Sequence, residues 1–219
     1  AIARIGQIDA SAEGASANSV AVSGTTVAVA IEAETTTDPG KVVFYNASDF
    51  TKLGQATVGA LPDMVTFTPD GQRVLVANEG EPSGDYATDP EGSVSVIDVS
   101  SGFQMPDVQT ADFRAYDDQA DALRERGGRL FGPRARVAQD LEPEYIAVAD
   151  DARTAYVSLQ ENNAIATVDI ETARVSAIHA LGEKDFSQAG QGIDPSNSDG
   201  LDIRGVPVSG LYQPDTIAV

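Results

Sequence analysis

The residues of this sequence best suited to chemistry are carboxylates that recur at matching places along the chain. One set stands directly before short apolar-rich runs, and a second set follows the next such run. Crowded carboxylates repel one another and raise each other's pKa unless a cation lies between them. Because the chain has no Cys and only one His, its oxygen ligands favour Ca²⁺ or Mg²⁺ over zinc or copper. We therefore predict a calcium-type site with the ligands Asp63, Glu79, Glu81, Glu144, Glu161 and Asp215.

A plainer interpretation is available for each of these acids taken singly. Asp and Glu side chains often stabilise turns or accept hydrogen bonds from nearby backbone N–H groups. Both interpretations also apply to an acidic loop that contains Asp85, Asp89 and Glu91. The loop from Gly192 to Asp202 has some likeness to an EF-hand loop, but its acids are out of phase with that pattern. We expect it to be a polar loop without a metal.

Basic residues are scarce, yet five of the 14 Lys and Arg residues fall within one short segment. The guanidinium group is a rigid fork suited to phosphate or carboxylate. If this segment folds over the acidic site, Arg129 and Arg134 are the candidates for binding a phosphorylated substrate. The alternative is that these side chains only neutralise an acidic surface. The five residues are Arg124, Arg126, Arg129, Arg134 and Arg136.

No catalytic residue can be assigned from the sequence. It contains no G-x-S-x-G nucleophile elbow, no Walker loop and no dinucleotide-binding fingerprint. The single histidine, His179, lies in an expected outer strand without a partner motif, so we expect it at the surface.

The charge balance excludes some partners. The chain has 34 Asp and Glu against 14 Lys and Arg, for a formal charge of −20. Such a chain is a poor ligand for nucleic acid or for an anionic membrane surface, which attract basic residues. A chain of this charge suits a saline environment, where salt screens the repulsion between its own charges. The alternative is that the chain is simply an acidic soluble protein. No apolar run approaches the length of a membrane span.

The elements that position these carboxylates come from an internal repeat. Each repeat has a short apolar strand, a tight polar turn, a second strand, a polar loop, and a third and a fourth strand. Four antiparallel strands with such turns are typical of one propeller blade. We predict an all-β chain, residues 1–219 forming one partial propeller domain. Its blades span about 18–58, 63–112 and 144–180, and a further blade begins at 215.

Two segments interrupt the repeat, at about 103–140 and about 183–211. In the first we expect a short helix, capped by Asp117 or Asp118 and ended by Gly127-Gly128. The second is rich in Gly, Ser, Asn and Asp, so we expect a loop. We also expect Ala3–Ile8 to be the outer strand of an earlier blade. A propeller needs about four to eight blades to close, so other sequence or another chain must supply the remaining blades; we expect seven in all.

Equivalent positions of a propeller surround one axis. The openings of the first strands therefore place Asn18, Asp63, Glu144 and Asp215 at one rim. The second strand returns toward the opening of the first, so the loops with Glu79, Glu81 and Glu161 lie at the same rim. This geometry is what makes distant carboxylates neighbours.

Several long runs resemble the choice-of-anchor I family of propeller proteins. They are Gly59–Gly71, Ala77–Pro82 with its continuation Asp89–Val94, Phe131–Pro133 followed by Ala138–Val148, and Leu159–Ala164. The resemblance implies a bacterial protein that is secreted or held at the cell surface, in an extracellular, periplasmic or surface location. Some members carry alkaline-phosphatase-like or phytase-esterase-like descriptions.

Two functions follow as hypotheses. In the first, the protein is a secreted or surface-held binding and structural module whose acidic rim holds calcium. In the second, it is a metal-dependent phosphoesterase in which calcium polarises a phosphate and activates water, and Arg binds the phosphate. We favour the first because no nucleophile or general base stands out. Its partner would be a phosphorylated small molecule or a surface component.

Overall fold

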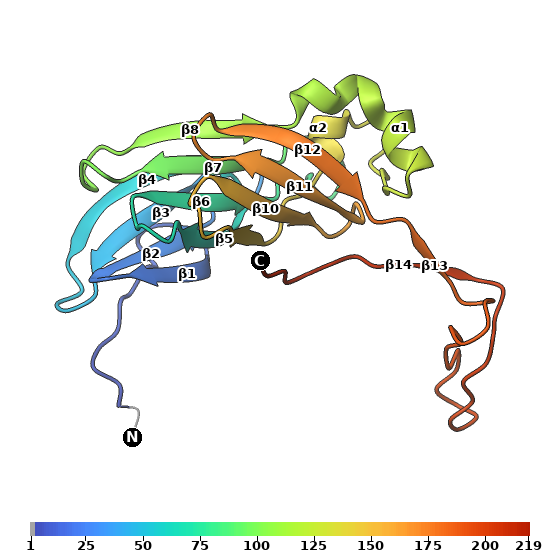
Figure 1. Ribbon diagram of the computed structural model, residues 1–219. Coiled ribbons are helices and arrows are strands. Elements are labelled where there is room, and N and C mark those ends of the chain that lie inside the picture. Colours follow the sequence, from blue (N-terminus) through green and yellow to red (C-terminus); the bar gives the residue numbers. More distant parts are fainter. Residues whose placement is uncertain (1–2) are drawn as a thin grey trace.

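The computed structural model describes residues 3–219, and its core is three four-stranded antiparallel sheets (Figure 1). In each sheet the strands are neighbours in chain order. The first sheet has β1 (Ala17–Ser23), β2 (Thr26–Ile31), β3 (Pro39–Asn46) and β4 (Lys52–Ala60). The second has β5 (Pro62–Phe67), β6 (Arg73–Asn78), β7 (Ser93–Asp98) and β8 (Asp107–Asp112). The third has β9 (Ile146–Val148), β10 (Thr154–Leu159), β11 (Ala164–Asp169) and β12 (Arg174–Ala180).

The turns between the first two strands of each sheet have the predicted chemistry. Gly24 and Gly71 adopt φ of 56° and 69°, a left-handed conformation that glycine reaches without strain. The Asp70 carboxylate accepts hydrogen bonds from Gln72 N at 3.0 Å and Thr68 Oγ1 at 2.6 Å. Asp151 accepts from Arg153 N at 2.8 Å in the same way. Side chains that complete their own turns fix each hairpin locally.

The three sheets stand side by side as propeller blades, with β1, β5 and β9 forming the inner edge (Figure 1). Two bonds join the inner strands of the first two blades. Asn18 Nδ2 donates to Pro62 O at 3.2 Å, and Ser19 Oγ accepts from Val65 N at 3.2 Å. The first strands therefore share one rim, as the repeat predicts.

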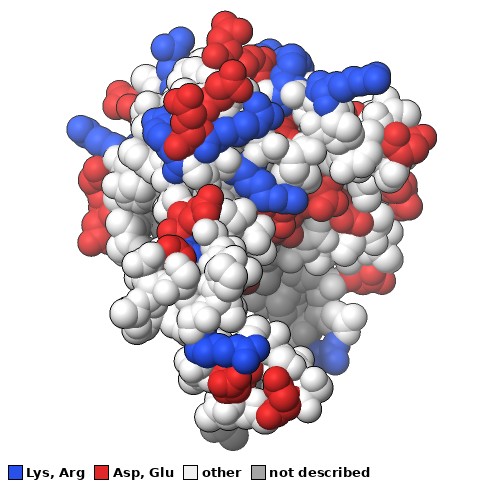
Figure 2. All heavy atoms as spheres, turned by 90° about the vertical axis from the view of Figure 1, so that its right-hand side faces the viewer, with Lys and Arg blue, Asp and Glu red and all other residues white. Residues whose placement is uncertain are grey.

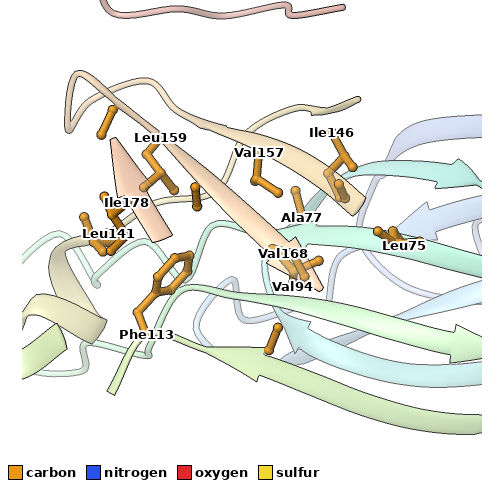
Figure 3. Close-up of a cluster of buried hydrophobic side chains, with 14 of the residues drawn as sticks. Leu75, Ala77, Val94, Phe113, Leu141, Ile146, Val157, Leu159, Val168 and Ile178 are labelled. Carbon is orange, nitrogen blue, oxygen red and sulfur yellow. The ribbon is translucent and has the colours of Figure 1, made fainter. Parts of the chain in front are cut away.

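Apolar faces of successive blades hold the fold together. Between the second and third blades, Leu75, Ala77 and Val94 face Val157 and Leu159 in one buried cluster (Figure 3). A second cluster fills the space between the first two blades and includes the fully buried Phe44. Burial of these β-branched and aromatic side chains is the main source of stability.

The first insertion carries the predicted helix, but its predicted cap is wrong. It contains η1 (Arg114–Gln119), α1 (Ala120–Glu125) and α2 (Val137–Asp140). Asp117 lies within η1, where its carboxylate accepts from Ala138 N at 2.9 Å and pairs with Arg136 at 3.1 Å. The acid thus joins two parts of the insertion instead of capping α1. Gly127 follows α1 with a φ of 90°, as expected of a residue that ends a helix.

Two expected strands are wrong. Residues 3–8 form no strand, although Ile8 packs against the cluster that contains Ile31 and Tyr45. Asp215–Val219 also forms no strand, although Ile217 to Val219 lie beside Tyr156 and Ile165 of the third blade. A strand needs a ladder partner, and residues 3–219 offer none to either segment. Within the second insertion, β13 (Glu183–Asp185) and β14 (Ser209–Leu211) form a small hairpin and the rest is loop.

Candidate metal centre at the inner rim

A shared backbone irregularity turns the rim side chains toward the site. In the first blade, Asn18 is the extra residue between the pairs Ala17–Ile31 and Ser19–Ala30. Asp63 is the extra residue at the same point of the second blade. In the third blade, Glu144 N donates to Ser158 O at 3.0 Å while Ser158 N donates to Tyr145 O at 2.9 Å. Such a bulge leaves one residue outside the ladder and re-aims its side chain.

Three of the six predicted ligands meet at this rim. Asp63, Glu79 and Glu144 each offer a carboxylate oxygen, and these oxygens lie within 4.8 Å of one another. Asp63 begins the inner strand of the second blade, Glu79 follows β6, and Glu144 begins the third blade. Within residues 3–219 no hydrogen bond or ion pair reaches any of these carboxylates. The group therefore joins two blades and lacks a basic partner.

Burial and mutual repulsion shift the pKa values of these acids upward. Burial, with the charges of Asp63, Glu81 and Glu144, raises the pKa of Glu79 to about 9. Burial and Asp63 raise the pKa of Glu144 to about 7. Burial, followed by the charge of Asp215, raises the pKa of Asp63 as well. A cation held between the carboxylates would remove the repulsion and favour their ionised forms.

The other three predicted ligands lie around this group and not within it. Glu81 is exposed, Glu161 is half-buried and Asp215 is exposed. Their charges reach the group, because Glu81, Glu161 and Asp215 all raise the pKa of Glu144. The structure thus divides the predicted set into three close carboxylates and three that surround them.

The sequence analysis missed Glu142. This residue is 6% exposed, and burial together with Glu161 and Glu81 raises its pKa to about 8. A signal was available, because the matching positions of the other openings are Ser16, Leu61 and Gln213. A carboxylate where the repeat otherwise has an uncharged side chain suggests a local role.

The acids outside the rim follow the plainer interpretation. Asp85 accepts from Ala87 N at 3.0 Å, and this bond, with one from Ser83, lowers its pKa. Glu91 forms ion pairs with Arg114 and Arg136. Asp194 accepts from Ser196 N at 3.3 Å within its own loop. Asp89 is the exception in the loop with Asp85, because burial and the charge of Asp140 raise its pKa and its Oδ1 has no hydrogen-bond partner among the described residues.

The five arginines of the first insertion have different partners in the structure, and three of them are bound to groups within the insertion or the loop after β6. Arg124 pairs with Asp121 at 3.4 Å, Arg126 donates to Ala122 O at 3.0 Å, and Arg136 is paired as described. Figure 2 shows that basic side chains gather over the end of the molecule with the first insertion, close to acidic ones.

The two predicted substrate-binding arginines lie in different surroundings. Arg129 reaches the rim, where it donates to Glu161 O at 3.2 Å. Arg134 is exposed beside the loop with Asp85 and Asp89, away from the three rim carboxylates. Of the two, only Arg129 therefore contacts a residue of the group that surrounds the three carboxylates.

The bulge of the third blade depends on one buried hydroxyl. Ser158 Oγ accepts from Tyr145 N at 3.0 Å and donates to Asp215 O at 2.9 Å. We expect Ser158→Ala to lower the free energy of unfolding by about 1–2 kcal/mol, because two polar partners lose their bond. Urea unfolding measures this loss. The matched change Ser176→Ala, in the exposed part of β12, should have a much smaller effect; equal effects would contradict the assignment.

Comparison with known proteins agrees with the four-stranded blades, which define a β-propeller. The model of the choice-of-anchor I domain matches residues 1–219, and the chain belongs to this family. No curated protein matches the sequence. The description of the family, choice-of-anchor I domain, suggests anchoring at the cell surface. No helix of the described residues is long and apolar enough to cross a membrane.

Solved structures share the fold at low sequence identity. The β-propeller domain of Cps50 (Swd1) from Myceliophteria thermophila has a TM-score of 0.50 and 10% identity, over 76% of this chain and 42% of that one. The β-propeller domain of the Trilobed protease from Pyrococcus furiosus has a TM-score of 0.40 and 11% identity, over 74% and 41%. The first match supports the predicted propeller fold. The chain spans less than half the length of these structures.

Proposed function

We propose that this protein is a secreted or cell-surface β-propeller whose inner rim binds Ca²⁺ and thereby stiffens a binding module. The observation that carries the proposal is the group of three unpaired carboxylates within 4.8 Å of one another. Their oxygen chemistry suits a hard divalent cation. Family membership supports the surface location.

Calcium at this rim would act as a link between blades. Asp63 and Glu79 come from the second blade and Glu144 from the third, so one ion would hold both inner edges. Glu81, Glu161 and Asp215 would add to the negative field that attracts it. Because the proton is the competitor for these carboxylates, calcium binding should release protons near neutral pH.

Calorimetric titration of the chelator-treated, intact protein with CaCl₂ tests this proposal. We expect saturable binding, and a loss of affinity of about a hundredfold in Asp63→Asn, since a directly bound carboxylate is removed. Asp199→Asn is the matched control, because Asp199 lies exposed in the second insertion. Absence of binding by the wild type, or equal binding by both variants, would refute the calcium site.

A metal-dependent phosphoesterase is the second candidate function. It is favoured by the position of Arg129, whose guanidinium group bonds Glu161 O at the edge of the acidic rim. There it would hold a phosphate oxygen while the ion polarised another. Calcium-dependent turnover of a chromogenic phosphomonoester that is lost in Asp63→Asn and Arg129→Ala would support the enzyme. Calcium binding without turnover would support the module.

A further inference from the structure

A pocket beside the metal centre is lined by aromatic rings as well as by carboxylates. It has a volume of about 370 Å³ and lies between the loop after β6 and the first insertion. Two aromatic rings and three carboxylates share its wall, along with Pro82, Ser83 and Gly84. The aromatic and acidic members are Tyr86, Phe131, Glu81, Glu142 and Glu161. Asp63, Glu79 and Glu144 do not line it.

Glu142 is the buried carboxyl group of this pocket. It is only 6% exposed, and its side chain lines the cavity. Its backbone N–H is fixed by Asn162 Oδ1 at 3.0 Å, and within residues 3–219 the carboxylate forms no hydrogen bond or ion pair with the protein. A buried carboxylate without a partner is costly unless a cation or a proton meets it. The pocket is the open space from which a cation can reach it.

The aromatic rings make this a site for an organic cation. Tyr86 and Phe131 remain 45% and 37% exposed, although rings of this size are normally covered. The Phe131 ring already receives a cation, since the Arg129 guanidinium carbon lies 4.0 Å from its centroid. Ring faces attract ammonium and guanidinium groups, and the attraction grows when the cation is desolvated.

We propose that this pocket binds an alkylammonium head group. Aromatic walls add nothing to the binding of a hydrated metal ion, which requires oxygen ligands. The three carboxylates repel anions and give a neutral ligand no charge to pair with. A methylated ammonium satisfies both features, because its charge faces Glu142 and its methyl groups contact Phe131 and Tyr86. The pocket shares Glu81 and Glu161 with the acids around the calcium site, but it contains none of the three close carboxylates.

Binding of choline to the intact protein tests this inference, with 3,3-dimethyl-1-butanol as its uncharged isostere. Calorimetry or NMR titration in chelator should show saturable choline binding, and affinity for the isostere should be lower by about tenfold or more, since the cation–aromatic attraction is lost. N-acetyl-trimethyllysine amide carries the same head group on a peptide backbone. Tighter binding of this probe than of choline would identify a protein ligand, and the reverse would identify a small molecule.

Two variants locate the binding. Phe131→Leu and Glu142→Gln should each weaken choline binding by about tenfold, because one removes the ring and the other the charge. Phe186→Leu is the matched control, since Phe186 also has a cation, Lys184 Nζ, 4.9 Å from its ring but lies outside the pocket.

Three results would overturn the inference. They are equal binding of choline and its isostere, no binding of either ammonium probe, and wild-type affinity in Phe131→Leu. Asp63→Asn should bind choline as the wild type does, because Asp63 does not line the pocket. Failure of the calcium site and failure of this pocket are therefore separate outcomes.

Discussion

The Glu79→Gln protein is expected to be more stable than the wild type in chelator at pH 8, and to lose this advantage in saturating calcium. Burial and neighbouring acids raise the Glu79 pKa from 4.5 to about 9 in the folded protein. The unfolded chain ionises Glu79 near its ordinary pKa. The stabilisation that the folded protein gains from protonated Glu79 is therefore fully present below about pH 4.5. That contribution falls as pH rises and is gone above about 9. A neutral glutamine avoids this loss.

The expected size follows from the same shift. One pKa unit corresponds to about 1.4 kcal/mol, and solvent screening reduces the result to on the order of 2–3 kcal/mol at pH 8. For a domain of this length, that raises the melting temperature by about 5–10 °C. In saturating calcium this advantage is cancelled, because the variant lacks one ligand. A hundredfold weaker affinity lowers the calcium stabilisation by about 2.7 kcal/mol.

Calorimetric melting curves at pH 5, 7 and 8, in chelator and in calcium, measure both effects. Glu34→Gln is the matched control, because Glu34 is exposed in the loop after β2, and it should melt like the wild type in both solutions. If Glu79→Gln is destabilised in chelator, the repulsion assigned to the rim is wrong.

The Asn162→Ala protein is expected to lose about 3–5 kcal/mol of stability, because three buried backbone groups lose a partner together. Asn162 is 1% exposed. Its Oδ1 accepts from Glu142 N at 3.0 Å, and its Nδ2 donates to Asp140 O at 2.6 Å and Arg129 O at 3.1 Å. One amide thus fixes the segment before the third blade and the end of the first insertion.

Urea unfolding measures this loss, and hydrogen exchange locates it. The Glu142 amide should exchange much faster in Asn162→Ala, because its acceptor is removed. Asn197→Ala, in an exposed loop, should change stability by less than about 0.5 kcal/mol. A loss of less than about 1 kcal/mol in Asn162→Ala would show that water replaces the amide and that the insertion is held by other contacts.

Sequence patterns predicted the blades because their causes are local. Alternating β-branched residues form the strands, and turns such as Pro69–Gly71 connect them wherever the chain places them. The repeat then predicted a common rim, and Asp63 and Glu144 do meet there. Neither step required knowledge of distant contacts.

The details of the site depend on causes that the sequence does not display. The bulge that turns Asp63 and Glu144 out of the ladder appears only in the strand register. Glu142 is important because Asn162 and the first insertion enclose it, and that enclosure is a tertiary contact. The segment 215–219 has the pattern of a strand but no ladder partner. In each case tertiary contacts, and not the local sequence preference, determine the observed structure.

A crystal structure of the intact protein grown in calcium tests the central claim most directly. The account predicts an ion at about 2.3–2.6 Å from carboxylate oxygens of Asp63, Glu79 and Glu144, identified by its anomalous signal. An ordered structure at saturating calcium in which these three side chains bond only to water or to one another would contradict it.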